Sequence, residues 1–113
     1  MSGATRGPHS LTHLSDSDCD RLYTLALENH RAGRIAEAIN LYRAVIAARP
    51  AFASACNNLG NALFSQGNLD AAIASYGQAL AVNSEYPDAH YNLGNVLAHQ
   101  GKLEAAAASF RRA

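Results

Sequence analysis

The chain has 113 residues, enough for one domain, and its charge is balanced, with nine Lys and Arg against nine Asp and Glu. This balance argues against nucleic acid or an anionic membrane as the partner, because both are bound through an excess of positive charge. A hydrophobic fraction of 49% with 16% charged residues is typical of a soluble folded protein and too apolar for wholesale disorder.

The first residues of the chain differ in composition from the rest. Residues 1–18 are rich in Ser, Thr, Gly and Pro and show no hydrophobic period, so we expect a flexible leader there, with Ser15 or Ser17 capping the first helix. The opening lacks the apolar core of an export signal, and no run of 18 apolar residues occurs in the sequence. Two cysteines, Cys19 and Cys56, give no disulfide framework. We therefore expect a cytoplasmic protein.

From residue 19 onward the sequence repeats every 34 residues. The string NLGN occurs at Asn58–Asn61 and again at Asn92–Asn95, and the same step leads from Tyr76 to Phe110. A more divergent copy precedes these two. The repeat thus divides the chain into three copies, at 19–52, 53–86 and an incomplete 87–113.

Each copy predicts two amphipathic helices separated by a glycine. In the second copy, Gly67 is placed to end the first helix at a positive φ, and Asn68 is placed to cap the second. Gly60 and Gly94 lie inside predicted helices, where glycine costs about 0.5–1 kcal/mol relative to alanine. We expect close crossing of two helices to explain them. The buried stripe of the first helix follows i, i+3, i+4 and i+7 spacing: Cys56, Leu59, Gly60 and Leu63.

These coordinated positions resemble the tetratricopeptide repeat, whose pattern is W-x2-L-G-x2-Y, A-x3-F and P. The resemblance covers residues 19–113. It implies an all-α fold, a right-handed superhelical solenoid of antiparallel helix–turn–helix hairpins in which the first helices line a concave groove. We expect weaker packing where the chain departs from the pattern, at Leu22, Cys56 and His90 in the large aromatic position and at Asn29 in place of an apolar residue.

Asparagines recur beside the buried stripe of the predicted first helices, although asparagine is a poor helix former. A carboxamide offers both a donor and an acceptor, so such residues can pair with the backbone of an extended peptide. The alternative is that Asn58 and Asn92 bond neighbouring helices and hold the stack together. The predicted groove contains Tyr23, Thr24, Asn57, Asn58, Asn61, Phe64, Tyr91, Asn92, Asn95 and His99.

The asparagine-rich helices and the phrase DAHYNLGNVLAHQGKLEAA are similar to the repeat arms of O-linked N-acetylglucosamine transferases and related bacterial repeat proteins. The resemblance implies a protein–protein interaction scaffold that binds an extended peptide or a partner helix. The alternative is the substrate-recruiting N-terminal arm of a larger enzyme, such as a glycosyltransferase, whose catalytic domain is not in this chain. A clamp for chaperone C-terminal carboxylates is disfavoured, since only Asn58 fits the positions that such a clamp uses.

Other chemistry is disfavoured by residue spacing. The histidines and cysteines lack close metal-ligand spacing, and the glycines are not followed by the Lys-Ser/Thr of a phosphate loop. Residues 53–86 contain no Lys or Arg, which leaves a nucleic-acid backbone without counter-charge. We expect no metal, no cofactor and no enzymatic activity.

The third copy is shorter than the repeat, since Ala113 is the 27th residue of a 34-residue unit counted from Pro87. We expect the chain to be part of a longer array. Repeats of this kind bury each apolar face on the next unit. We therefore expect an exposed edge around Leu103 and Phe110 that favours self-association, and fraying of the last residues, 111–113.

Overall fold

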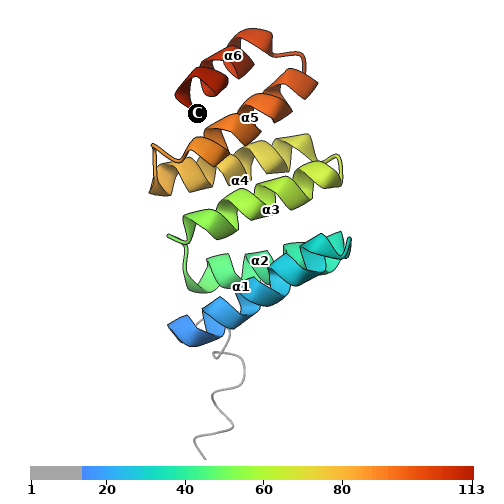
Figure 1. Cartoon of the computed structure of the whole chain (residues 1–113), viewed down its shortest axis with the longest axis vertical. Helices are drawn as coiled ribbons and strands as arrows, with labels where there is room; N and C mark the ends of the chain where they lie inside the picture. Colours follow the sequence, from blue (N-terminus) through green and yellow to red (C-terminus); the bar gives the residue numbers. More distant parts are fainter. Residues whose placement is uncertain (1–13) are drawn as a thin grey trace, which may run out of the picture.

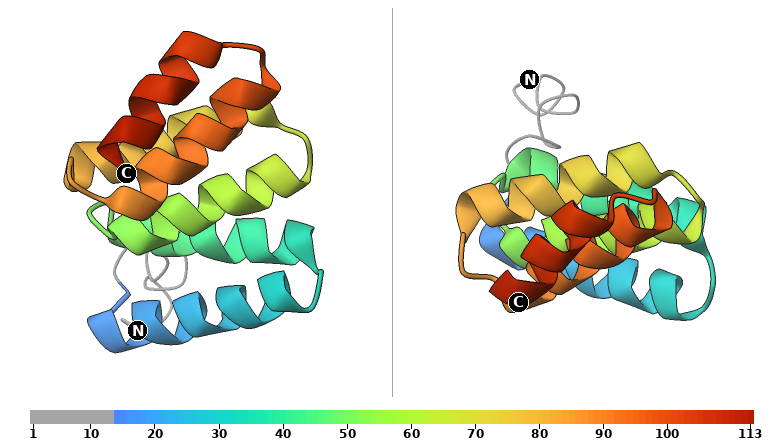
Figure 2. Two further views of the ribbon diagram at one scale, coloured as in Figure 1. Left: turned by 45° about the horizontal axis from the view of Figure 1, so that its top comes forward. Right: turned by 90° about the horizontal axis from the view of Figure 1, so that it is seen from above.

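A computed structural model describes residues 14–113 and shows a stack of three helical hairpins (Figure 1). The two helices of each hairpin run antiparallel, and successive hairpins lie one above another in chain order (Figure 2). The described residues contain only helices and their connections, so the all-α solenoid is confirmed. The helices are α1 (Asp16–Arg31), α2 (Ile35–Ala48), α3 (Ala53–Ser65), α4 (Leu69–Val82), α5 (Pro87–His99) and α6 (Leu103–Arg112).

The helix boundaries follow the 34-residue period closely. α3 and α5 begin at Ala53 and Pro87, the first residues of the predicted second and third copies. α1 begins at Asp16, so the last three residues of the predicted leader, 16–18, are helical instead. The rest of that predicted segment, up to residue 13, lies outside the described residues. α6 stays helical to Arg112, within the segment 111–113 that the sequence predicts to fray.

A glycine with positive φ connects the helices of every hairpin. The φ values are 82° at Gly33, 80° at Gly67 and 79° at Gly101, a region that side chains with a Cβ rarely adopt, which confirms the predicted turn. The predicted cap at Asn68 is wrong, because its side chain makes no capping hydrogen bond. Its backbone N–H donates instead to the Leu63 carbonyl at 3.0 Å, so the turn itself sets the start of α4.

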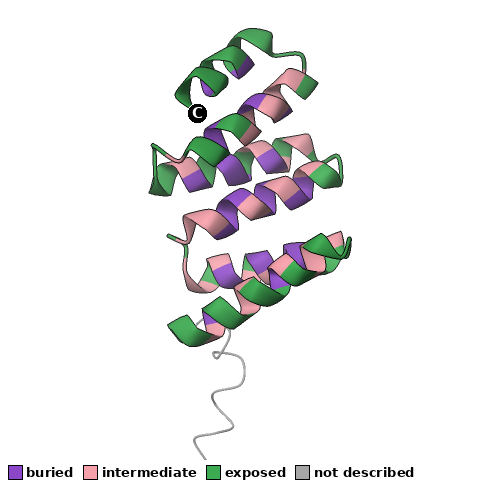
Figure 3. Ribbon diagram, viewed as in Figure 1, coloured by how far each residue is buried: buried purple, intermediate pink, exposed green. Residues whose placement is uncertain are grey.

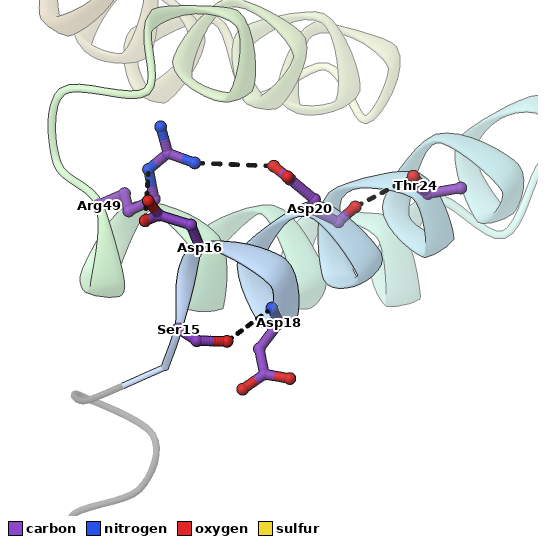
Figure 4. Close-up of polar contacts among 6 residues, drawn as sticks. All are labelled: Ser15, Asp16, Asp18, Asp20, Thr24 and Arg49. Carbon is purple, nitrogen blue, oxygen red and sulfur yellow. Dashed lines mark hydrogen bonds and ion pairs between the residues drawn. The ribbon is translucent and has the colours of Figure 1, made fainter.

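The start of α1 is held by a side-chain cap and by contacts with the α2–α3 connection (Figure 4). Ser15 is the cap, since its hydroxyl accepts from the Asp18 N–H at 3.1 Å. The Ser15 hydrogen bond, and then that of Arg21, lower the pKa of Asp18. Arg49 reaches across from the end of α2 toward two carboxylates of α1. Its guanidinium lies 3.6 Å from Asp20 and 3.9 Å from Asp16.

Burial is deepest in the middle hairpin, whereas much of α1 and α6 is exposed (Figure 3). Tyr42 and Tyr76 are the largest fully buried side chains, and each projects from the second helix of its hairpin toward the first. A Cβ on Gly60 would lie 2.5 Å from the Tyr76 ring, and one on Gly94 would lie 2.5 Å from the ring of Phe110. These glycines therefore make room for an aromatic ring. The predicted reason, close crossing of two helix backbones, needs this correction.

The places where the chain departs from the repeat pattern are filled in different ways. Cys56 and His90 are both buried, as their equivalent positions predict, and His90 Nε2 lies 2.8 Å from the Ser84 carbonyl oxygen. Burial raises the pKa of the Cys56 thiol. Asn29 is only half-buried, and its amide donates to the Leu25 carbonyl at 2.8 Å. Leu25 itself is 45% exposed, so the first hairpin packs less tightly than the second.

Candidate functional site

Hydrogen bonds join the first helices of successive hairpins into one row. The Asn58 amide of α3 donates to the Tyr23 hydroxyl of α1 at 2.7 Å, and the Asn92 amide of α5 donates to the Asn57 carboxamide oxygen of α3 at 3.1 Å. α3 and α5 also contact each other directly. We call the side chains along this row the first-helix surface: Tyr23, Asn58, Asn61, Phe64, Tyr91, Asn92, Asn95 and His99.

Tyr42 and Tyr76, which are buried on the second helices, form hydrogen bonds with side chains of the first helices. The Tyr76 hydroxyl donates to the Asn61 carboxamide oxygen at 2.5 Å, and the Tyr42 hydroxyl lies 2.9 Å from His30 Nδ1. Burial raises the pKa of Tyr76 and raises that of Tyr42 to about 12, so both phenols keep their protons at neutral pH. Burial lowers the pKa of His30, which favours the neutral ring that a hydroxyl donor requires.

These hydrogen bonds determine which asparagine side chains are accessible to a partner protein. Asn57 is buried, with 4% of its surface exposed, so this predicted groove residue supports α5 and does not face a ligand. Its position on the inner side of α3 brings its oxygen to Asn92, which is the reason for this correction. Asn58 and Asn92 are half-buried and bond neighbouring helices, as the alternative interpretation expects. Their contact with a peptide stays a prediction.

Aromatic rings occupy the same surface. Phe64 of α3 and His99 of α5 meet edge to face with ring centroids 5.0 Å apart. Tyr91 of α5 lies 5.8 Å from the ring of Phe110, and 56% of its surface is exposed. An exposed ring beside amide groups is a common feature of protein recognition surfaces, because the ring adds contact area at low cost in conformational entropy.

Thr24 does not join this group. It stands 34 residues before Asn58, at the same repeat position, but its side chain bonds within its own helix. Its hydroxyl donates to the Asp20 carbonyl at 3.0 Å (Figure 4). The side chain lines a shallow open hollow on α1 together with Ser17, Asp20, Arg21, Leu25 and Glu28.

The hydrogen bonds of the buried second-helix tyrosines were not predicted from the sequence. Tyr42 and Tyr76 carry a hydroxyl where Phe110 has none, and this difference within the repeat is the signal that could have identified them. Phe52 was also missed. Its ring lies 4.7 Å from that of Tyr23 and under the Arg49 guanidinium, at 4.8 Å.

The first-helix surface carries little charge. α3 contains no charged residue, and α5 contains only Asp88 and the two ionisable residues His90 and His99. Within residues 14–113, no group of three His, Cys, Asp or Glu side chains is arranged to hold a metal ion. Across the same residues, no helix is both long and apolar enough to cross a membrane. The site therefore offers amides and aromatic rings for recognition.

Two family models match the chain. One, described as a tetratricopeptide repeat, covers residues 23–76, and another, described as a TPR repeat, covers residues 60–101. Together with the stacked hairpins, these matches define a helical-repeat protein. The chain belongs to the tetratricopeptide repeat family. Comparison with curated protein sequences gave no significant match.

Several solved structures share the fold. The first TPR of Spaghetti (RPAP3) bound to the HSP90 peptide SRMEEVD is 24% identical, with a TM-score of 0.85, and the match covers 88% of this chain and 79% of that one. The Yersinia enterocolitica chaperone SycD in complex with a peptide of the translocator YopD is 21% identical, with a TM-score of 0.84, over 88% of this chain and 76% of that one.

A crystal structure of MamA is 22% identical, with a TM-score of 0.81, and the match covers 90% of this chain. The chain spans 57% of the MamA chain, little more than half of its length. At these identities the likeness establishes the fold alone.

Proposed function

We propose that the protein is an interaction scaffold that binds an extended segment of a partner protein on its first-helix surface. The observation that carries this proposal is the row of carboxamide and aromatic side chains along α3 and α5, on helices with almost no charge. Carboxamides match the N–H and C=O groups of a peptide backbone, and exposed rings pack against apolar side chains. The peptides bound by the RPAP3 domain and by SycD support this use of the fold.

The same residues indicate what kind of segment fits. Acidic tails are usually held by Lys and Arg. Residues 53–86 have neither, and neither occurs in α5. We therefore propose an uncharged segment with at least one large apolar side chain as the ligand, in contrast to the acidic SRMEEVD peptide of the RPAP3 domain.

Replacing Tyr91 with Ala tests the proposal. Tyr91 is 56% exposed, so the substitution should remove contact area for the peptide with little effect on the fold. Peptides selected on the wild-type chain from a phage-displayed library of random linear sequences serve as probes. We expect Tyr91→Ala to weaken their binding about tenfold, as loss of an aromatic contact worth roughly 1.4 kcal/mol would.

Val82→Ala is the matched control, since Val82 is an exposed apolar residue of α4, away from the first-helix surface. It should bind the probes like the wild type. Equal binding by the wild type and both variants would show that the peptides use another surface, and the proposal would then be wrong.

A further inference from the structure

In both the second and the third hairpin, an aromatic ring of the second helix packs against a glycine of the first helix. The nearest ring atoms of Tyr76 lie 2.5 and 2.7 Å from the Cβ position of Gly60, and those of Phe110 lie 2.5 and 2.7 Å from that of Gly94. The two rings therefore occupy equivalent places in their hairpins. Only Tyr76 carries a hydroxyl.

That hydroxyl determines whether the carboxamide oxygen of the nearby first-helix asparagine already accepts a hydrogen bond. Tyr76 donates to the carboxamide oxygen of Asn61, which stands 15 residues earlier. Asn95 stands in the same relation to Phe110, which has nothing to donate. Within residues 14–113 the Asn95 carboxamide makes no hydrogen bond, and only its backbone oxygen is engaged, 3.1 Å from His99 Nδ1. Within residues 14–113, Asn61 is thus occupied at its acceptor, whereas Asn95 keeps both its donor and its acceptor free.

The surroundings of Asn95 suit a ligand. Tyr91 precedes it by four residues and His99 follows it by four, so the three side chains lie on one face of α5. Tyr91 is the most exposed aromatic residue of the described chain. His99 meets the Phe64 ring of α3 at the other end of this stripe. An unoccupied carboxamide therefore lies between two aromatic contacts.

We propose that Tyr91, Asn95, His99 and Phe64, called here the α5 stripe, form the subsite that determines which peptide binds. This inference rests on the proposed function. Asn95 pairs with an N–H and a C=O of the extended peptide backbone, since a carboxamide can donate and accept at once. A large apolar side chain of the peptide packs on Tyr91. The third hairpin, and not the second, therefore dominates recognition.

The test gives the third hairpin the ring hydroxyl that the second one has, and the probes are the same phage-selected linear peptides, synthesised with blocked ends. Phe110→Tyr should place a hydroxyl beside Asn95, as in the Tyr76–Asn61 pair, and occupy its acceptor. Asn95→Ala removes the carboxamide altogether. We expect each variant to bind about fivefold more weakly, the effect of one hydrogen bond worth roughly 1 kcal/mol. Because both act on one group, the double variant should bind no more weakly than Asn95→Ala alone.

Tyr76→Phe is the matched control, because it removes the equivalent hydroxyl in the second hairpin. It should bind the peptides no more weakly than the wild type. Normal binding by both Asn95→Ala and Phe110→Tyr, with loss of binding in Tyr91→Ala, would overturn this inference and leave the proposed function standing. If no peptide is selected, or if Tyr91→Ala binds normally, the proposed function fails first. Should Phe110→Tyr not fold, Asn95→Ala decides alone, since Asn95 makes no side-chain hydrogen bond within residues 14–113 that its loss could break.

Discussion

The ring of Tyr76 lies where a side chain on Gly60 would have to stand. A Cβ there would come within 2.5 Å of a ring that is fully buried. Gly60→Ala gains about 1 kcal/mol of helix propensity but overpacks the core at a cost of about 1–3 kcal/mol. We expect a lower free energy of unfolding, by up to about 2 kcal/mol, measured by denaturant titration.

Gly77 provides the matched control for Gly60. It also lies inside a helix, α4, but a Cβ added there would meet nothing within 4 Å. Gly77→Ala should therefore stabilise the protein by about 1 kcal/mol. Stabilisation by both substitutions would mean that the Tyr76 ring moves aside easily, and our account of the glycine would not hold.

The same residues show what sequence reasoning can and cannot reach. The 34-residue period and the turn glycines predicted the three hairpins because backbone conformation and apolar spacing are local properties. The pairing of the asparagines was not predictable in this way. Asn57 and Asn58 are adjacent and chemically identical, yet one is buried against Asn92 and the other is half-buried against Tyr23. Their roles depend on how successive hairpins are oriented.

At the scale of the helix, α1 depends on the cap at its first turn. Ser15 accepts from the Asp18 N–H, so Ser15→Ala leaves that N–H without its intramolecular partner. Loss of such a cap costs about 1 kcal/mol. We expect faster hydrogen exchange at the Asp18 amide and its neighbours, with α3 to α5 unchanged, because the loss is confined to the end of one helix.

Ser17 is the control for this helix. It is exposed and, within the described residues, is not a capping residue, so Ser17→Ala should leave exchange in the first turn unchanged. If hydrogen exchange in the first turn were accelerated equally in both variants, the effect would come from a general loss of stability in this turn and not from loss of the cap. The Arg49 contacts alone contribute little, since their carboxylates are largely exposed and such pairs are worth about 0–1 kcal/mol.

At the scale of the whole molecule, the two ends of the described stack have opposite charge. α1 carries four acidic residues, Asp16, Asp18, Asp20 and Glu28, against Arg21 and Arg31. α6 carries Arg111 and Arg112 against Glu104, and Lys102 directly precedes it. Apolar residues also lie exposed on the described part of α6, with Leu103 at 70% and Phe110 at 39%.

We therefore expect weak head-to-tail association, in which α6 of one copy lies against α1 of another, as α2 lies against α3 within the chain. In sedimentation velocity experiments, the sedimentation coefficient should rise with protein concentration. High salt should lower it again, since salt screens the attraction between the oppositely charged ends. Leu103→Glu should abolish the rise, because it places a charge in the apolar contact and weakens the positive end. Val82→Glu, at a residue 42% exposed on α4, should keep it. A coefficient independent of concentration in the wild type would show that these ends do not bind each other.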